Sequence, residues 1–182
     1  MPFKIYNQQN LHFITFSVVQ WVDVFTRPAY KDIVVDSLIY CQNNKGLNIH
    51  GWCIMSNHLH LILSAKQGFN LSDILRDFKK YTATAILKDI ESNKRESRRR
   101  WMLWLFRRAG IANSNNKTFQ FWRNDNHPKE IISSDFYHQK MDYLHYNPVK
   151  AGFCKRATDY PYSSASWYED KTGLISIDEV LM

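Results

Sequence analysis

The chain has 182 residues, of which 45% are hydrophobic and 15% aromatic, which is enough apolar material for one domain with a buried core. Its formal charge of +7, from 24 Lys and Arg against 17 Asp and Glu, favours a polyanionic partner. Three widely spaced cysteines argue against a disulfide framework or a zinc ribbon, and neither a signal-peptide pattern nor a membrane-length apolar run is present.

The N-terminal part of the chain alternates strand and helix patterns. β-branched and aromatic residues over 11–19 predict a strand. Apolar residues at helical spacing over 31–45 predict a helix, which should end near Gly46. Two dense apolar runs, 47–55 and 58–64, predict two strands with a short connection between them.

The clearest predicted helix covers residues 71–90. Its apolar residues form a stripe, and Arg76, Lys79 and Lys80 fall on roughly the opposite face. On an isolated helix such a basic face is usually solvated. Beside a polyanion it would contact backbone phosphates.

The region 91–118 allows two interpretations. Its arginine run includes Arg98, Arg99 and Arg100 and is followed by Trp101. These side chains would either hold a single strand of nucleic acid and stack on its bases, or belong to a second helix whose aromatic side faces the core. The sequence alone leaves both interpretations open.

The C-terminal third predicts a strand over 119–123 and then a helix over 133–146, which should end before Pro148 because proline disfavours α conformation in the preceding residue. From residue 151 the tail reads as irregular, with a short helix over 177–181. The order β-α-β-β-α-β-α predicts an α+β fold, with a ferredoxin-like or RRM-like antiparallel sheet and packed helices. We expect one domain over the whole chain, since no linker divides it.

A His-Leu-His triplet lies at the start of the third predicted strand. Side chains two residues apart share a face of a strand, so His58 and His60 project together while Leu59 packs on the other face. Two neutral imidazoles side by side are suited to bind a divalent metal. The alternative is a pair of partly exposed histidines that bind nothing.

The last long predicted helix carries a second candidate group. Tyr143 and Asn147 are four residues apart, so they lie about one turn from each other on one face. The Asn147 carbonyl would complete a metal shell while Tyr143 points at the same site. Since the chain has 10 tyrosines, a packing role with the hydroxyl at the rim is the alternative for Tyr143.

At these stretches the chain resembles the REP-associated tyrosine transposases, a branch of the single-tyrosine HUH (His-hydrophobic-His) transposases and endonucleases. The resemblance covers about residues 10–168. It rests on Gly-Trp-Cys-Ile-Met-Ser-Asn-His-Leu-His at 51–60, Phe-Lys-Lys-Tyr-Thr at 78–82, Phe-Trp at 121–122, Tyr-Leu-His-Tyr-Asn-Pro-Val-Lys-Ala-Gly at 143–152 and Tyr-Pro-Tyr-Ser-Ser at 160–164.

The resemblance implies a role for each candidate residue. His58 and His60 would be ligands of a divalent metal, Mn²⁺ or Mg²⁺, with Asn147 as a polar residue of the metal shell and Tyr143 as the nucleophile. The implied activity is that of a single-stranded DNA endonuclease and strand transferase, acting on hairpin or palindromic repeat DNA through a 5′-phosphotyrosine intermediate. We expect the protein in the cytoplasm, associated with the nucleoid and not with membrane, as a monomer, with a dimer as the alternative.

Basic and aromatic residues outside the motif are candidates for DNA contacts. They are Arg76, Lys79, Lys80, Arg98, Arg99, Arg100, Trp122, Arg123 and Lys150, with Trp101 and Trp104 as further candidates for stacking. For each aromatic residue, packing in the core is the alternative.

Other functions stay open at this point. One is a non-catalytic RRM-like module that binds nucleic acid. Another is a metal-dependent hydrolytic nuclease, in which His58, His60 and an acid such as Asp125 or Asp142 activate water. A domesticated relative that cuts host repeats would use the same tyrosine chemistry. Because histidines must be neutral to bind metal, activity is expected to fall as the pH drops through about 6.5.

Overall fold

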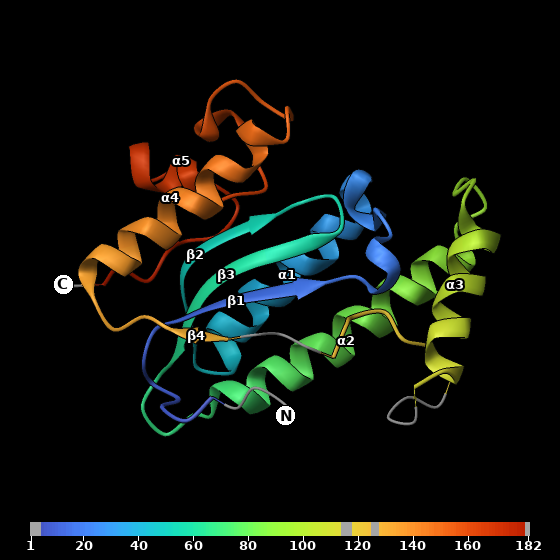
Figure 1. Cartoon of the computed structure of the whole chain (residues 1–182), viewed down its shortest axis with the longest axis horizontal. Coiled ribbons are helices and arrows are strands. Elements are labelled where there is room, and N and C mark those ends of the chain that lie inside the picture. The colour runs from blue at the N-terminus through green and yellow to red at the C-terminus, as the bar shows by residue number, and fades with distance from the viewer. Residues whose placement is uncertain (1–4, 114–117, 125–127, 181–182) are drawn as a thin grey trace.

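The computed structural model describes residues 5–113, 118–124 and 128–180 (Figure 1). Its centre is a four-stranded antiparallel sheet with the order β2-β3-β1-β4. The strands are β1 His12–Ser17, β2 Leu47–Ile54, β3 His58–Ala65 and β4 Lys129–Glu130. This strand order, with α1 and α2 as crossovers, confirms the predicted ferredoxin-like α+β fold.

Helices cover both faces of this sheet. They are α1 Pro28–Asn44, α2 Leu71–Ser92, α3 Arg99–Ile111, α4 Ser134–Lys150 and α5 Ala165–Asp170, with short 3₁₀ turns η1 Val19–Trp21, η2 Val24–Thr26 and η3 Ala157–Asp159. Figure 1 shows α4 crossing the sheet near β2, α1 behind the strands, and α3 beyond one end of the sheet. None of the helices in the described ranges is long and apolar enough to cross a membrane.

The alternation of side chains along β3 separates two hydrophobic clusters. Leu59, Leu61 and Leu63 are fully buried in the larger cluster, which α1 and α2 complete. Ile62 lies in the smaller cluster, which α4 completes. Because successive side chains point to opposite faces, the histidines of β3 are on the α4 side, and their leucine neighbours hold the strand against the other layer.

A glycine in β2 lets α4 approach the sheet closely. Gly51 lies at an irregularity in the pairing of β2 with β3. A Cβ atom built on Gly51 would lie 2.6 Å from the sulfur of Met141 and 3.3 Å from a methyl carbon of Leu144, both on α4. The distance between this helix and the sheet therefore depends on the absence of a side chain at residue 51.

We expect Gly51→Val to push α4 away from the sheet and to lower the free energy of unfolding by about 1–3 kcal/mol through overpacking. Urea denaturation measures this effect. The double variant Gly51→Val/Met141→Ala is the control, because it removes the side chain that the new methyl groups would meet and should recover part of the loss. Equal stability of Gly51→Val and the natural protein would contradict the close approach.

The end of α4 differs from the prediction. The helix continues through Pro148 to Lys150, so the prediction that it ends before the proline is wrong. Proline removes one backbone donor, but here it lies in the last turn. The N–H groups of Ala151 and Gly152 close that turn by donating to Asn147 and Val149, and Gly152, at φ +76°, then reverses the chain.

The region between α2 and β4 also differs from the prediction. Residues 119–123 form no regular strand: they make one isolated bridge, Val18 to Trp122, and run beside the end of β1 and η1. The edge position beside β1 is taken instead by β4. Within 91–118, residues of α3 do form a second helix, but Trp101 and Trp104 are 49% and 55% exposed and do not face the core.

The C-terminal tail protects the free edge of β2. The predicted helix over 177–181 is wrong, since residues 176–180 are not helical and the last two residues lie outside the described ranges. The N–H of Asp178 donates to the Ile49 carbonyl and its carboxylate accepts from the Ile49 N–H. Edge backbone groups need partners, and these bonds supply them. The tail is also less irregular than expected, because it contains η3 and α5.

Candidate active site

Three of the predicted site residues come together on the α4 side of the sheet. The rings of His58 and His60 lie 4.7 Å apart between centroids, with an interplanar angle of 75°. Tyr143, from α4, has its ring centroid 5.1 Å from that of His60 and is 48% exposed. Strand periodicity aligns the two histidines, whereas the packing of α4 on the sheet brings Tyr143 to them.

The hydrogen bonds of Asn57 determine which nitrogen of His58 carries the proton. The Asn57 amide NH₂ donates to the backbone carbonyl of Trp21 at 3.2 Å, so its Oδ1 faces His58. His58 Nδ1 lies 2.7 Å from that oxygen and must donate, because an amide oxygen only accepts. The lone pair of His58 is therefore on Nε2, the nitrogen left for a ligand.

His60 is held in a comparable way. Its Nδ1 lies 3.0 Å from the hydroxyl of Thr15 on β1, and its ring stacks on Phe13 at 5.5 Å between centroids. Its Nε2 is buried and has no hydrogen-bond partner among the described residues. Buried polar atoms are nearly always paired, so a nitrogen left this way fits a missing ligand. The two imidazoles together therefore fit a divalent metal as two of its ligands.

A hydrolytic site with a third acidic ligand has less support. Within the described ranges, no group of three or more His, Cys, Asp or Glu side chains is placed to hold a metal. Asp142 is thus not gathered with the histidines, and Asp125 lies outside the described residues. Asn147 lies one turn beyond Tyr143, and its amide donates to the Tyr143 backbone carbonyl at 3.0 Å. That bond is internal to α4 and gives no support to Asn147 as a ligand.

Burial keeps the site histidines neutral. Desolvation lowers the pKa of His58. It also lowers the pKa of His60 to about 3, with further contributions from the charges of His58 and Lys140. The loss of activity expected near the free-histidine pKa is therefore displaced to more acidic pH. Both rings are able to bind metal at neutral pH without losing a proton.

Two histidines, the buried His60 and the partly buried His145, predict a loss of stability in acid. The folded protein keeps His60 and His145 neutral, with pKa values of about 3 and about 4, mainly because of burial. The unfolded chain binds these protons below about pH 6.5, so stability is complete above that pH and falls as the pH drops towards the folded values. Each group contributes a slope approaching about 1.4 kcal/mol per pH unit.

We expect urea denaturation in metal-free buffer to show a clear loss of unfolding free energy between pH 7 and pH 5. His145→Gln should reduce the slope of unfolding free energy against pH by the contribution of about one proton. His138→Gln, at an exposed position of the same helix, is the matched control. A stability profile that is flat between these pH values would contradict the prediction.

Arg76 and Arg98, two of the expected DNA-contact arginines, form ion pairs with carboxylates of the protein. Arg76 pairs with Asp73 and Asp77 on the surface of α2. Arg98 pairs with the buried carboxylate of Glu96 and with Asp23, which ties the start of α3 to η2. A structural role explains Arg98 better than a DNA contact.

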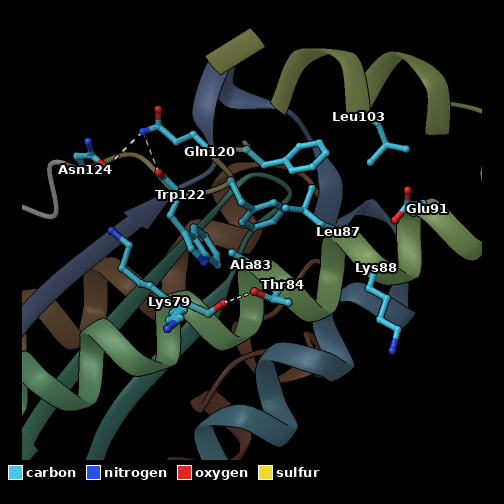
Figure 2. Close-up of a pocket in the computed structure, with 13 residues that line it drawn as sticks. Lys79, Ala83, Thr84, Leu87, Lys88, Glu91, Leu103, Gln120, Trp122 and Asn124 are labelled. Carbon is cyan, nitrogen blue, oxygen red and sulfur yellow. Dashed lines mark hydrogen bonds between the residues drawn. The ribbon is translucent and has the colours of Figure 1, made fainter. Parts of the chain in front are cut away.

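Trp122 does not provide a stacking surface. Its ring is 4% exposed, and its Nε1 donates to the Thr82 hydroxyl of α2 at 3.0 Å. Figure 2 shows Trp122 between the chain that carries Gln120 and helix α2, with Lys79 beside it. Lys79 Nζ donates to the carbonyl of Arg123 at 2.8 Å. Of the other candidates, Arg99 donates to a carbonyl of α2, whereas Lys80, Arg100 and Lys150 are exposed.

Sequence reasoning missed two residues at the site. Trp21 is 54% exposed, and its ring meets that of His58 edge-on at 6.2 Å between centroids. No motif or spacing relates it to the histidines. Lys140 Nζ lies 5.7 Å from the ring centroid of Tyr143 and 5.1 Å from that of Phe13. Its position three residues before Tyr143 on one helix was a usable signal.

Comparisons with known proteins concern the family and the fold of the chain. Residues 6–107 match the family model described as IS200-like transposase. The whole chain superposes on 99% of a REP-associated tyrosine transposase solved with a REP hairpin, with a TM-score of 0.65 and 17% identity. A putative transposase from Deinococcus radiodurans is 15% identical over 79% of this chain and 95% of its own, with a TM-score of 0.44. The comparison with curated protein sequences returns no match.

Proposed function

Because the chain belongs to the IS200-like transposase family, we propose that it cleaves and rejoins single-stranded DNA with Tyr143 as the nucleophile. The observation that carries this proposal is the approach of the Tyr143 ring to within 5.1 Å of His60, beside the His58–His60 pair. A half-exposed phenol is accessible to a substrate in solution, and the two neutral imidazoles beside it would hold a cation in the same site.

The proposed substrate is hairpin DNA with an unpaired foot. The REP-associated transposase of similar fold was solved with a REP hairpin, and the net charge of +7 suits a nucleic-acid partner. An unpaired foot would allow a phosphate to reach a tyrosine on a helix, since a strand free of its complement is less constrained. The exposed Lys80, Arg100 and Lys150 would contribute phosphate contacts.

The proposed reaction exchanges one phosphodiester for another. The Tyr143 oxygen forms a bond to phosphorus, the bond from phosphorus to the 3′ oxygen breaks, and the phenol proton is lost as the 3′ hydroxyl forms. The product is a 5′-phosphotyrosine, which a 3′ hydroxyl of another strand can attack to reverse the exchange. No water or nucleotide triphosphate is consumed. The Lys140 ammonium beside the Tyr143 ring is placed to offset phosphate charge.

His58 and His60 would hold a divalent metal, Mn²⁺ or Mg²⁺, through Nε2. When bound, such a metal neutralises non-bridging phosphate oxygens and stabilises developing charge. The part of the protein is to keep both rings neutral by burial and to orient them through Asn57 and Thr15. Imidazole ligands are softer than an all-oxygen shell, which favours Mn²⁺.

Covalent capture tests the reaction. The purified protein is mixed with labelled hairpin oligonucleotides, chosen from palindromic sequences in the DNA around its gene, and with Mn²⁺ or EDTA. The products are separated on denaturing gels. We expect a protein–DNA adduct that depends on metal. Cleavage that leaves free 5′-phosphate ends and no adduct would favour hydrolysis. Binding without cleavage or adduct would favour a non-catalytic binding module.

The metal site has its own prediction. A ligand that binds only the folded state raises stability, so Mn²⁺ should raise the melting temperature of the natural protein. His60→Ala should remove that rise, because it deletes the buried Nε2 that lacks a partner. His12→Ala is a control from the same sheet, since His12 is buried and bonded to its own loop. Equal stabilisation of His60→Ala by Mn²⁺ would contradict the proposed ligand set.

A further inference from the structure

Trp21 is exposed at the edge of the candidate active site. It lies in η1, directly after β1, and its ring is 54% exposed. One side of the ring meets His58, at 6.2 Å between centroids, and the guanidinium carbon of Arg123 lies 5.5 Å from the ring centroid. Trp21 is therefore next to His58, whereas Tyr143 is next to His60.

The backbone holds Trp21 in an unusual conformation. Gln20 and Trp21 have φ values of +54° and +55°, a region that favours glycine. A bulky aromatic residue there is rare, and such conformations persist mainly where they serve a function. The bond from the Asn57 amide to the Trp21 carbonyl fixes this turn to the strand that carries the histidines. The position of the indole is thus coupled to the site and gains little from burial.

An open cleft lies next to the indole. Its volume is about 520 Å³, and it is lined by η1, the C-terminal end of α3 and the chain around Arg123. The lining includes the amides of Gln20, Asn113 and Gln120, and none of its described residues is acidic. A space of this size beside an aromatic face and a guanidinium suits a planar, anionic group better than an apolar chain.

We propose that Trp21 and Arg123 form a subsite for the unpaired nucleotide adjacent to the scissile phosphate, with its base stacked on the indole and its phosphate against the guanidinium. This inference rests on the proposed function, which puts the scissile phosphate at the histidines and Tyr143. The next nucleotide of the strand then lies over Trp21. Every base has a π-face, so the subsite accepts any base and fixes the register of the strand.

A binding experiment with abasic DNA tests the subsite directly. The probe is a fluorescent stem–loop oligonucleotide, chosen from palindromic sequences in the DNA around the gene, with an unpaired foot of about six nucleotides, long enough to pass the subsite. The stem fixes the register, and one foot position in turn is made abasic. Affinities are measured by fluorescence anisotropy with Tyr143→Phe, which cannot cleave, and with Tyr143→Phe carrying Trp21→Ala or Trp21→Phe.

We expect one abasic position to weaken binding by about 5- to 150-fold when Trp21 is present, the range for loss of one base–aromatic stack. The same position should have no effect with Trp21→Ala, and Trp21→Phe should retain most of the effect. Arg123→Gln should reduce the dependence of the binding constant on salt concentration by the amount expected for about one phosphate contact. Trp21→Gly accepts the positive φ, so its melting temperature should be no lower than that of the natural protein. It should nevertheless lose the effect of the abasic position on binding. If the role of Trp21 were purely structural, the substitution would lower the melting temperature.

The subsite would be overturned if the losses of binding free energy caused by the abasic position and by Trp21→Ala were additive. Absence of binding to every probe would also overturn it. The covalent assay keeps this result separate from the proposed function. An adduct formed by the natural protein together with additive Trp21 effects would remove the subsite and leave the nuclease. Coupling between Trp21 and one foot position without any adduct would keep Trp21 as a base-stacking residue and remove the nuclease.

Discussion

Tyr143→Phe is expected to abolish the covalent protein–DNA adduct while hairpin binding and melting temperature stay unchanged. The substitution removes one oxygen atom, and the ring keeps its contacts with His60 and Phe13. The loss should exceed about 10³-fold in the rate of adduct formation, because no other group replaces a missing nucleophile. Single-turnover assays with labelled hairpin DNA and Mn²⁺, resolved on denaturing gels, measure this rate.

Tyr146 is the matched control for this experiment. It lies on the same helix and is 60% exposed, and the tyrosine ring that meets His60 is that of Tyr143. Tyr146→Phe should leave adduct formation intact. An adduct that persists in Tyr143→Phe and disappears in Tyr146→Phe would transfer the nucleophile to Tyr146. Persistence in both variants would mean that neither residue is the nucleophile.

Glu96→Ala is expected to cause the largest loss of stability of any single substitution outside the hydrophobic core. The side chain of Glu96 is fully buried and forms ion pairs with Arg27 at 2.5 Å and with Arg98 at 3.2 Å. It also accepts from the Tyr30 hydroxyl at 3.3 Å. Burial alone would raise the pKa of Glu96, but hydrogen bonds from Arg98 and Arg27 outweigh it, and the net effect lowers that pKa.

Removing one partner of a buried ion pair costs about 3–5 kcal/mol, since the other charge is left without compensation. Arg27 is partly exposed and can reach water, so we expect the lower part of this range for Glu96→Ala in urea denaturation. Glu169→Ala, which breaks the exposed pair with Arg156, is the control and should cost less than about 1 kcal/mol. Similar small losses in both variants would show that Glu96 does not anchor α3.

Local patterns in the sequence were sufficient for most of the fold and for the centre of the site. Strand alternation put His58 and His60 on one face and their leucine neighbours on the other, because the side-chain period of a strand is fixed by its backbone. The amphipathic period predicted α2 in the same way. Resemblance to a known family then singled out Tyr143 among the tyrosines, which spacing alone could not do.

Other features depended on contacts between distant parts of the chain. Trp122 is buried, with its indole N–H donating to the Thr82 hydroxyl. Arg98 forms an ion pair with the buried carboxylate of Glu96. The tail pairs with the edge of β2 instead of forming a helix, since exposed backbone groups there offer better partners. Each outcome is set by the surroundings of the residue and leaves no periodic signal.

The sequence by itself determined the strands β1, β2 and β3, the helices α1 and α2 and the shared face of His58 and His60, since all of these follow from backbone periodicity. Only the tertiary structure decided that α4 brings Tyr143 to His60. Only the tertiary structure decided that Trp21 stands beside His58 with its ring in solvent. The physical reason is that such proximity comes from packing helices and loops on the sheet, and packing depends on residues far apart in the chain.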